Sequence, residues 1–567
     1  MRLLSLATRK GRRRFARYRH IVSTLVAYGF GEIVYQTGVG KLLYVLSRPF
    51  RSRRRREGAT RQEATTWVRI RMVIEHLGPT FIKLGQILSN RPDLIPRPLQ
   101  QELARLRDDV PPFPADEAIK IIEQELGRPV EELFHDFNEQ PMAAASVAQI
   151  HRATLPGGEA VVVKVQRPGL EELAQVDVEI LKELAGVIER HFPETRRVSP
   201  RDIAAEFEQG IRQELDFMRE ASAIERFAGQ FQGDDGIKVP KVYRAYGGKR
   251  VLTMEFMEGR RMSELLDAGP KDEAEGARIA AIGADLTLKQ IFTFGYFHAD
   301  PHPGNILVLE DGKLCYVDFG LTGNLIQRDR EVVSDLLISM IGQNEQKAAK
   351  AVIRLAGSRD YQAAQKIERE IARLIDRFQN AQAGDYSFTS LLGELIEVLI
   401  DVGLRLPSDL FLLVKTLMTI EGVATGLDPS FDFTAHVKPF VETLVRERYS
   451  QKRIGPKVLA TAEDYGELLQ RFPGDYYRLV DAFSNGRQNV SLDENSIRSV
   501  RRTVLQATSA LVFAMVLGSL TLGSAVIVHS KVPPLWHGVS VIGIIGFAAA
   551  GIVGLGLLVK ILRTGGF

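Results

Sequence analysis

Two short motifs in the second half of the chain place acidic and amide side chains at spacings that suit phosphate chemistry. The first is HADPHPGN, His298–Asn305, in which Asp300 and Asn305 lie five residues apart on a tight loop. The second is DFG, which begins thirteen residues further on, at Asp318. Asn305 and Asp318 offer the hard oxygen ligands that Mg²⁺ prefers, and Asp300 can act as a base or orient a nucleophile. The two motifs predict a site for phosphoryl transfer.

Upstream residues supply the other parts of a nucleotide site. Lys164 lies in the apolar run VVVKV, where a strand can hold one ammonium toward the α and β phosphates. PMAAASVAQIHRA has alanines at the one–three–six spacing of a glycine-rich phosphate loop, and LTMEFMEG resembles a hinge whose backbone would hold adenine. With ATP and Mg²⁺ as the predicted cofactors, the nucleotide-binding residues are Ala143, Ala144, Ala145, Ser146, Val147, Ala148, Lys164, Glu255 and Met257.

The order and spacing of these motifs are typical of kinases, although each motif alone carries little weight. Four details depart from protein kinases. Alanine replaces glycine in the phosphate loop, Ala299 replaces the usual arginine, His302 stands where a lysine is usual, and no APE segment follows DFG. A peptide platform ordered by phosphorylation is therefore not expected. HADPHPGN is closer to the HGDxHxxN motif of small-molecule kinases such as aminoglycoside and choline phosphotransferases.

Four signatures together resemble the UbiB family of atypical kinase-like proteins, which includes mitochondrial ATPases of coenzyme Q biosynthesis. FIKLGQILSNRPDLIP contains a KxGQ motif at Lys83, Gly85 and Gln86, and AAASVAQIH is an alanine-rich loop. QELDFMREA contains an ExD motif at Glu214 and Asp216, and FHADPHPGNI with DFG completes the set. The resemblance covers about residues 62–430, and ordinary kinases do not share the combination of KxGQ with the alanine-rich loop.

The resemblance assigns roles that the residues alone leave open. It implies that Glu220 pairs with the strand lysine, so that Asp300, Lys164 and Glu220 form the catalytic set. It also implies that the KxGQ helix packs over the cleft, where a peptide substrate would otherwise lie. The residues implied to gate the cleft are Lys83, Gln86, Glu214 and Asp216. Without the resemblance, these four side chains would be interpreted as ordinary polar faces of helices.

Periodicity indicates which elements carry the motifs. Apolar residues at three- and four-residue steps predict a helix over 62–90, and PADEAIKIIEQELG predicts another, Pro114–Gly127. Strands are expected in AAASVAQIHRATL, EAVVVKVQ and RVLTMEFM. The 56 positions between Lys164 and Glu220 predict inserted helices over about Glu171–Ser199. After Gly259 we expect mainly helices, apart from a hairpin that turns at Asp311–Gly312.

A chain of 567 residues is too long to fold around one hydrophobic core, so several domains are expected. The predicted fold class is α+β: an atypical protein-kinase-like fold of two lobes, with a helical N-terminal extension and a C-terminal transmembrane helical hairpin. The predicted domains are a basic, membrane-proximal segment at 1–61, the helical extension with KxGQ at 62–135, the N-lobe with its inserted helices at 136–258, the C-lobe at 259–430, a helical segment at 431–500 and the transmembrane hairpin at 501–567.

Hydropathy and charge both point to a membrane. Two uncharged, mostly apolar segments at about 504–528 and 539–559 each reach the roughly 20 residues that cross a bilayer, and a short link with two prolines joins them. Arg501 and Arg502 precede the pair and Lys560 and Arg563 follow it, which places both ends on the cytoplasmic side. Small residues, among them Gly546 and Gly554, would let the two helices approach closely.

The basic N-terminal region fits the same location. The net charge is +4 overall and +13 over residues 1–60, and therefore −9 over the rest. With a membrane predicted, the clusters Arg9–Arg19 and Arg48–Arg56 are interpreted as contacts to anionic lipid rather than to nucleic acid, and the apolar stretch between them as an interfacial segment. The Arg-rich start also has features of an organellar transit peptide, and that alternative stays open. The one cysteine, Cys315, fits a reducing compartment.

These patterns lead to one functional hypothesis and two alternatives. The chain is predicted to be a membrane-anchored kinase-like ATPase that supports prenyl-quinone (ubiquinone-type) biosynthesis in a bacterial inner membrane. The expected partners are ATP, anionic lipid, a prenylated phenol or quinone intermediate and quinone-biosynthesis proteins, without nucleic acid. One alternative is a small-molecule or lipid kinase with an isoprenoid or phenolic acceptor, and the other is a non-catalytic lipid-binding scaffold. Because alanine restricts the backbone freedom that glycine allows, the alanine-rich loop is predicted to suppress transfer to protein and leave slow ATP hydrolysis.

Overall fold

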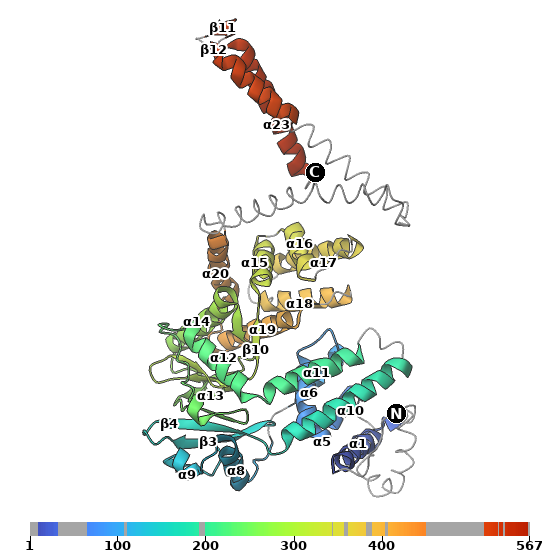
Figure 1. Ribbon diagram of the computed structural model, residues 1–567, viewed down its shortest axis with the longest axis vertical. Helices are drawn as coiled ribbons and strands as arrows, with labels where there is room; N and C mark the ends of the chain where they lie inside the picture. The colour runs from blue at the N-terminus through green and yellow to red at the C-terminus, as the bar shows by residue number, and fades with distance from the viewer. Residues whose placement is uncertain are drawn as a thin grey trace, which may run out of the picture. The chain divides into compact units, whose positions relative to one another are not determined.

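The computed structural model describes residues 9–31, 65–106, 110–191, 199–342, 344–356, 361–380, 388–402, 406–448, 515–530, 532–536 and 539–564. The chain forms two compact units, Met1–Arg453 and Ile454–Phe567 (Figure 1). The predicted basic cluster Arg48–Arg56, most of the predicted helical segment 431–500 and the first part of the predicted hairpin lie outside the described residues.

An antiparallel sheet forms the N-lobe of the first unit. Its order is β1-β3-β4-β5, with β2 paired to β3. The strands are β1 (Asp136–Phe137), β2 (Ala143–Ala144), β3 (Ala148–Thr154), β4 (Ala160–Gln166) and β5 (Val251–Glu255). The three strand-forming stretches predicted from the sequence are confirmed, the first of them as β2 and β3 together. The lysine strand is thus the central partner of both β3 and β5.

Alternation along β4 decides which way its lysine points. Val161, Val163 and Val165 share a buried cluster with helix α8 (Ala115–Leu126) and helix α9 (Val130–Leu133). The residues between them must face the opposite side of the sheet, because successive strand side chains alternate. On that side Lys164 contacts α12 (Phe217–Gln230). The predicted helix Pro114–Gly127 is confirmed as α8, which Gly127 ends with a φ of +71°.

A helical extension packs beside the N-lobe. It consists of α5 (Thr66–Leu77), α6 (Pro79–Ser89) and α7 (Arg97–Leu103), together with α10 (Leu170–His191) and α11 (Pro200–Glu214). Helices α10 and α11 lie side by side and against α6 (Figure 1), so the predicted insertion between lysine and glutamate is helical. The single helix predicted over 62–90 is wrong, since Gly78 at a φ of +90° separates α5 from α6.

Helix α1 (Arg9–Ala27) corrects part of the membrane interpretation of the N-terminus. Arg17 pairs with Asp177 of α10 at 2.7 Å, and Arg14 pairs with Glu179 at 3.2 Å. Ile21 is buried against the extension rather than presented to a lipid surface. These arginines are used within the protein because α10 offers carboxylates at matching positions.

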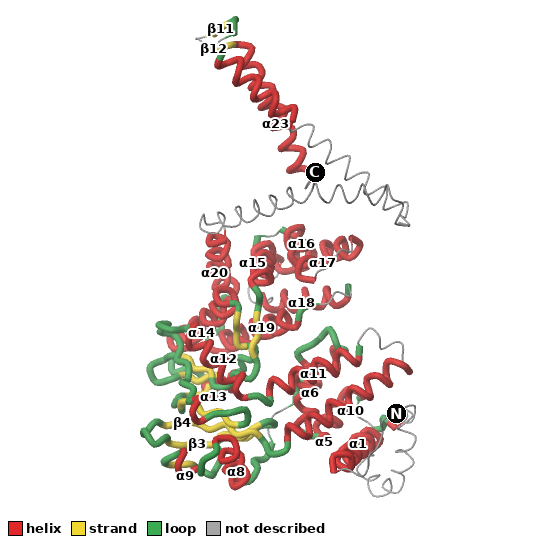
Figure 2. The backbone as a smooth tube through the Cα atoms, viewed as in Figure 1, coloured by secondary structure: helices red, strands yellow, loops and turns green. Residues whose placement is uncertain are grey.

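Short strands and many helices form the rest of the first unit (Figure 2). A sheet of order β6-β8-β9 and the pair β10-β7 lie among the helices. The predicted hairpin is confirmed as β8 and β9, which turn at Gly312 with a φ of +79°. The strands are β6 (Arg260–Arg261), β7 (Tyr296–His298), β8 (Ile306–Val308), β9 (Leu314–Tyr316) and β10 (Thr322–Asn324). The helices are α13 (Met262–Ala268), α14 (Glu273–Leu288), η4 (Lys289–Phe294), η5 (Pro303–Asn305), α15 (Gln327–Ile341), α16 (Glu345–Ala356), α17 (Tyr361–Asn380), α18 (Phe388–Asp401), α19 (Ser408–Leu427) and α20 (Phe433–Arg448).

Helix α19 is, among the residues that the structure describes, the one helix both long and apolar enough to cross a bilayer. Its most apolar window is 56% buried within the protein, and it packs along α14. Leu413, Leu417 and Ile420 are all buried in the C-lobe core. This helix is therefore a core element of the first unit.

The second unit contains two apolar helices that pack together. They are the helix Met515–His529 and α23 (Val541–Thr564). A Cβ on Gly546 would overlap Ser524, and one on Gly543 would overlap Val528, so glycine is needed for this approach. The predicted helical pairing is present in the described residues, while the crossing of a membrane stays a prediction.

Removing Arg17 should destabilise the extension, because Asp177 is fully buried and would lose its counter-charge. Burial raises the pKa of Asp177, and Arg17 opposes that rise. Arg17→Met should therefore cost about 3–5 kcal/mol near neutral pH. The loss should shrink toward pH 5, because a carboxyl with a raised pKa becomes neutral earlier as the pH falls.

Urea unfolding followed by the fluorescence of Trp67, which lies on α5, measures this loss in a background that lacks Trp536. The double variant Arg17→Met/Asp177→Asn should recover much of the stability. An equal loss at pH 8 and pH 5 would contradict the explanation.

Candidate active site

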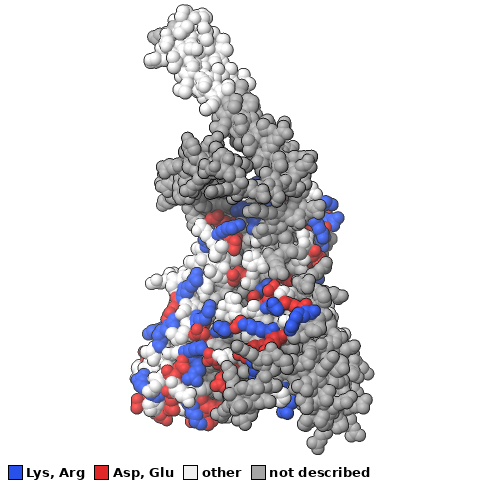
Figure 3. Space-filling view, turned by 45° about the vertical axis from the view of Figure 1, so that its right-hand side comes forward, with Lys and Arg blue, Asp and Glu red and all other residues white. Residues whose placement is uncertain are grey.

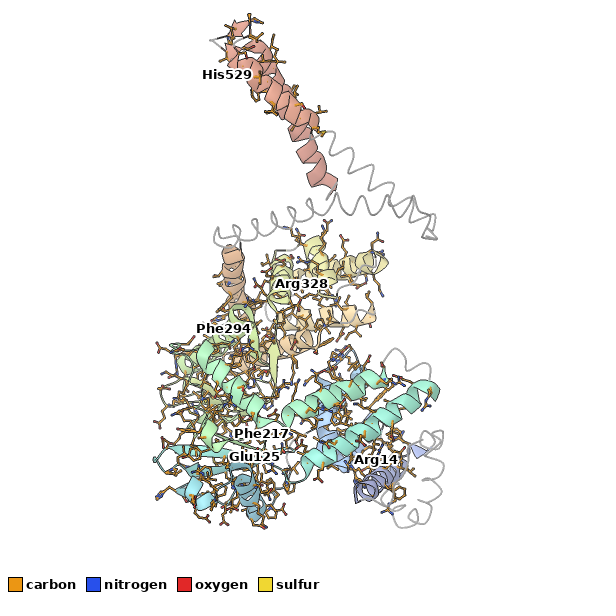
Figure 4. All side chains as sticks on the ribbon, in the orientation of Figure 1. Arg14, Glu125, Phe217, Phe294, Arg328 and His529 are labelled. Atoms are coloured by element: carbon orange, nitrogen blue, oxygen red, sulfur yellow. The ribbon has the colours of Figure 1, made fainter. Side chains whose placement is uncertain are left out.

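A buried ion pair between β4 and α12 forms the centre of the site. The Lys164 Nζ lies 2.8 Å from Oε1 and 2.9 Å from Oε2 of Glu220. Phe217, labelled in Figure 4, stands at the start of the same helix. Its aromatic ring lies 5.4 Å from the ammonium. The predicted pairing across 56 positions is thus present, and the helices inserted between strand and glutamate do not prevent it.

The DFG segment joins this pair. Asp318 Oδ1 lies 3.7 Å from Lys164 Nζ and accepts a hydrogen bond from the Gly320 amide at 2.9 Å. Phe319 is buried against Phe227 of α12, with ring centroids 5.0 Å apart. Its amide donates to Glu220 Oε1 at 3.4 Å. The buried phenylalanine therefore fixes the chain on one side, and the 48% exposed Asp318 side chain is available on the other.

These contacts fix the charge states at neutral pH. The Lys164 ammonium, opposed by burial and helped by the Gly320 amide, lowers the pKa of Asp318 to about 2. Burial alone would lower the pKa of Lys164, but the carboxylates of Asp318 and Glu220 raise it above its usual value. Burial raises the pKa of Glu220, against the effect of Lys164. A charged lysine and an ionised Asp318 therefore face each other, as phosphate and metal binding require.

The HADPHPGN loop is held by hydrogen bonds among its own residues and by one to the DFG segment. His298 Nδ1 accepts from the Asp300 amide at 3.2 Å, and its Nε2 donates to the Asp318 carbonyl. Burial lowers the pKa of His298, so the ring is neutral and fits this assignment of donor and acceptor. The Asp300 carbonyl accepts from His302 N at 2.7 Å and from Asn305 Nδ2 at 3.3 Å. His298 thus ties the two motifs together.

Lys415 is a charged residue of the site that the sequence analysis missed. Its Nζ lies 2.8 Å from Asp300 Oδ1, although it stands 115 positions further along the chain, on α19. Its surroundings in sequence, LLVKTLMT, are those of an ordinary core helix. The signal that could have found it is the single charge within this otherwise uncharged run.

The alanine-rich loop is a β-hairpin rather than the start of a helix. Ala143 pairs with Ile150 of β3, and the Ala145 amide donates to the Ala148 carbonyl at 2.8 Å. The Ala145 carbonyl accepts from the Arg167 guanidinium at 2.7 Å. Ser146, Val147 and Ala148 are buried, and Ala143 and Ala145 are exposed. Hydrogen bonds of the backbone therefore close this loop, which lies at the start of β3, the strand that pairs with β4.

Two amides of the hinge are already hydrogen-bonded to other parts of the protein. The Glu255 amide donates to the Lys241 carbonyl at 2.8 Å, and the Phe256 amide donates to the Ala160 carbonyl at 3.0 Å. The Glu255 side chain pairs with Lys238 at 3.2 Å and is not part of the catalytic cluster. Among the bonds of the described residues none comes from the Met257 amide, so of the predicted hinge residues Met257 has its amide available for an adenine ring.

An ion pair joins the KxGQ helix to the ExD motif. Lys83 Nζ lies 2.5 Å from Glu214 Oε1. Asp216 instead caps α12, where its Oδ1 accepts from the Met218 amide at 3.1 Å. Gln86 is half-buried on α6, and Gly85 faces the extension, where a Cβ would overlap Leu106. The close approach that Gly85 permits is therefore to α5 and α7 and not to the catalytic residues.

The side chains also fit a magnesium ion held together with phosphates. Because Asn305 donates through Nδ2, its Oδ1 remains as an oxygen ligand, and Asp318 adds an ionised carboxylate. Mg²⁺ is usually bound by one or two protein groups plus substrate phosphates. The described residues contain no cluster of three or more His, Cys, Asp or Glu that could hold a metal without such phosphates.

Comparison with known proteins identifies the family. The model of the ABC1 atypical kinase-like domain matches residues 105–352, that of the UbiB helical domain matches 371–432, and that of the ABC1/UbiB kinase-like C-terminal domain matches 495–563. A "Probable protein kinase UbiB" of Xanthomonas campestris is 32% identical over 518 residues, covering 87% of this chain and 89% of the relative. The chain belongs to the UbiB family.

Other relatives agree with this assignment. A "Probable protein kinase UbiB" of Marinobacter nauticus is 35% identical over 69% of this chain and 71% of its own length. An "Uncharacterized protein in hydrogenase 1 5'region" of Clostridium pasteurianum is 28% identical over 97% of this chain and 99% of its own. The suspected UbiB resemblance is confirmed, as is an α+β kinase-like fold. The roles of the individual site residues stay predictions.

Glu220→Gln should weaken nucleotide binding without unfolding the chain. The amide has nearly the same shape as the carboxylate but no charge, so Lys164 loses the partner that holds its ammonium in place. We expect a dissociation constant for Mg·ATP about tenfold higher, equal to about 1.4 kcal/mol, by isothermal titration calorimetry. Glu225→Gln, on the exposed side of the same helix, is the matched control. An unchanged affinity for Mg·ATP in Glu220→Gln would contradict the role of Glu220 in holding Lys164 for nucleotide binding.

Ala145→Gly should alter nucleotide handling, because glycine widens the φ range of a loop that now closes on itself. We expect autophosphorylation to rise and the affinity for nucleotide to change, measured with radiolabelled ATP and by calorimetry. Ala104→Gly, at an exposed position at the end of α7, is the control. If neither autophosphorylation nor the affinity for nucleotide changes, the alanines have only a packing role.

Proposed function

We propose that this protein is a membrane-anchored, kinase-like ATPase that supports prenyl-quinone (ubiquinone-type) biosynthesis and hydrolyses ATP slowly rather than phosphorylating protein. One observation carries the proposal: Lys164 of β4 lies 2.8 Å from Glu220 of α12 and 3.7 Å from Asp318 of the segment after β9. These are the groups that phosphoryl transfer needs, because its catalysis is mainly positioning and charge stabilisation.

The residues of the chain divide the work as follows. Lys164 binds phosphate oxygens and is kept charged by its two carboxylates. Asn305 and Asp318 would hold Mg²⁺, which offsets phosphate charge when bound. Asp300 orients a water molecule and takes its proton as the water oxygen bonds to the terminal phosphorus and the bond to ADP breaks. The amide of Met257 would bind adenine, and the hairpin of the alanine-rich loop would lie over the phosphates.

Transfer to a protein is disfavoured by the helical extension. Helix α6 is tied by the pair of Lys83 with Glu214 to the end of α11, just before α12, the helix that carries Glu220. The hydrogen bonds that close the alanine-rich loop limit its rearrangement around the triphosphate. We infer that water has access to the terminal phosphate more readily than a peptide hydroxyl does.

The second unit supports the membrane anchor. The described surface of its helices is white in Figure 3, without charged side chains on the face seen. Its exposed residues include Met515, Leu522, Ile545 and Ile552. Apolar side chains that point outward from a closely packed helix pair suit lipid tails. The bacterial inner membrane, with the first unit on its cytoplasmic side, and contact with a prenylated intermediate are parts of this proposal.

ATP hydrolysis by the full-length chain in anionic liposomes tests the function. Wild type should release phosphate slowly, faster with a phenolic prenyl lipid present, and Asp318→Asn should lower the rate by about 10²-fold because a metal ligand is lost. Asp311→Asn, in the exposed turn between β8 and β9, is the matched control.

The other outcomes separate the alternatives. Equal rates of ATP hydrolysis in wild type and Asp318→Asn would contradict the proposal that this protein is an ATPase. Phosphate recovered on the lipid instead of in solution favours a lipid kinase. If Asp318→Asn abolishes binding of Mg·nucleotide but still restores quinone in a deletion strain, the protein is a scaffold.

A further inference from the structure

The carboxylate of Asp300 is positioned from outside its own loop. The loop fixes the backbone of Asp300 through His298, His302 and Asn305. None of these three contacts involves the carboxylate, which instead accepts from Lys415 at 2.8 Å. The direction of the side chain therefore depends on α19.

His302, the basic residue of the loop itself, caps a short helix. His302 stands two positions after Asp300, where a protein kinase has lysine. Its Nδ1 accepts from the Gly304 amide at 3.2 Å and so caps the short helix η5. Lys415 brings to Asp300 the positive charge that this histidine does not bring.

The helix that carries Lys415 is held firmly against the loop. The neighbouring Thr416 is fully buried, and its hydroxyl donates to the His298 carbonyl at 3.4 Å. Near the start of α19, the Asp409 carboxylate accepts from the Asn324 amide at 3.3 Å. A lysine on a fixed helix loses less freedom in forming an ion pair than one on a mobile loop, so its charge is better preorganised.

Charge supports the same role. Glu214, Glu220 and Asp300 are each paired with an ammonium, from α6, β4 and α19 respectively. A carboxylate that orients water beside a triphosphate is repelled by the phosphates, and a cation at 2.8 Å offsets this repulsion.

We propose that Lys415 is a positioning residue for the phosphoryl-transfer step: it holds the Asp300 carboxylate toward the attacking group and offsets its charge. This inference rests on the proposed function. It predicts a loss in turnover rather than in nucleotide affinity, since Lys415 acts through Asp300 and not through the residues that bind Mg·ATP.

Steady-state ATP hydrolysis by the full-length chain in liposomes tests the inference. Lys415→Met should lower kcat by about 10–100-fold, with the KM for Mg·ATP changed less than about twofold. Lys415→Arg, which keeps the charge, should recover a large part of kcat. In Lys415→Met/Asp300→Asn the two losses should not add, so the double variant should match Asp300→Asn alone.

Lys289→Met is the matched control for loss of a C-lobe ion pair. Lys289 pairs with Asp234 at 2.6 Å and is 38% exposed, against 37% for Lys415, and it does not contact Asp300. Thermal midpoints of all variants are measured beside the kinetics. If Lys289→Met lowers kcat as much as Lys415→Met, or if the losses of Lys415→Met and Asp300→Asn add, the ion pair is structural and the inference is wrong.

Two further outcomes distinguish this inference from the function on which it rests. If Asp318→Asn is inactive while Lys415→Met retains the wild-type kcat, only the positioning role fails. If wild type hydrolyses no ATP, the proposed function fails and the inference fails with it.

Discussion

The buried pair of Lys164 with Glu220 is the interaction on which the site depends. Two charges removed from water are tolerated only when they neutralise each other closely, so β4 and α12 must meet at this point. That contact also places Phe319, whose amide bonds to the same carboxylate, and with it Asp318. The sheet alternation that buries three valines under α8 directs the lysine to the other side.

Around this centre, ion pairs connect separate parts of the chain. Lys83 ties α6 to the end of α11, and Lys415 ties α19 to the HADPHPGN loop. Asp216 contributes by capping the helix that presents Glu220. Several residues that sequence patterns group as one motif thus act in different ways: Glu214 binds a lysine, whereas Asp216 stabilises a helix terminus.

Sequence patterns predicted what depends on neighbouring residues. The alternation in VVVKV, the turn at Gly312 and the helix stop at Gly127 are local, and each is present. The break at Gly78 was missed because the apolar periodicity continues across it. The partners of Arg17 and Asp300 lie 160 and 115 positions away, and no local pattern encodes such contacts. The pairing of Lys164 with Glu220 was predicted from a family resemblance and not from spacing.

Helix α19 has a consequence for how the protein can be divided. It lies within the match to the UbiB helical domain at 371–432, whereas Asp300 lies in the ABC1 match at 105–352. A fragment cut at the border between these matches would keep every kinase motif yet lack Lys415 and Thr416. The two matched segments therefore meet at one ion pair, and the first of them does not by itself contain the partner of the Asp300 carboxylate.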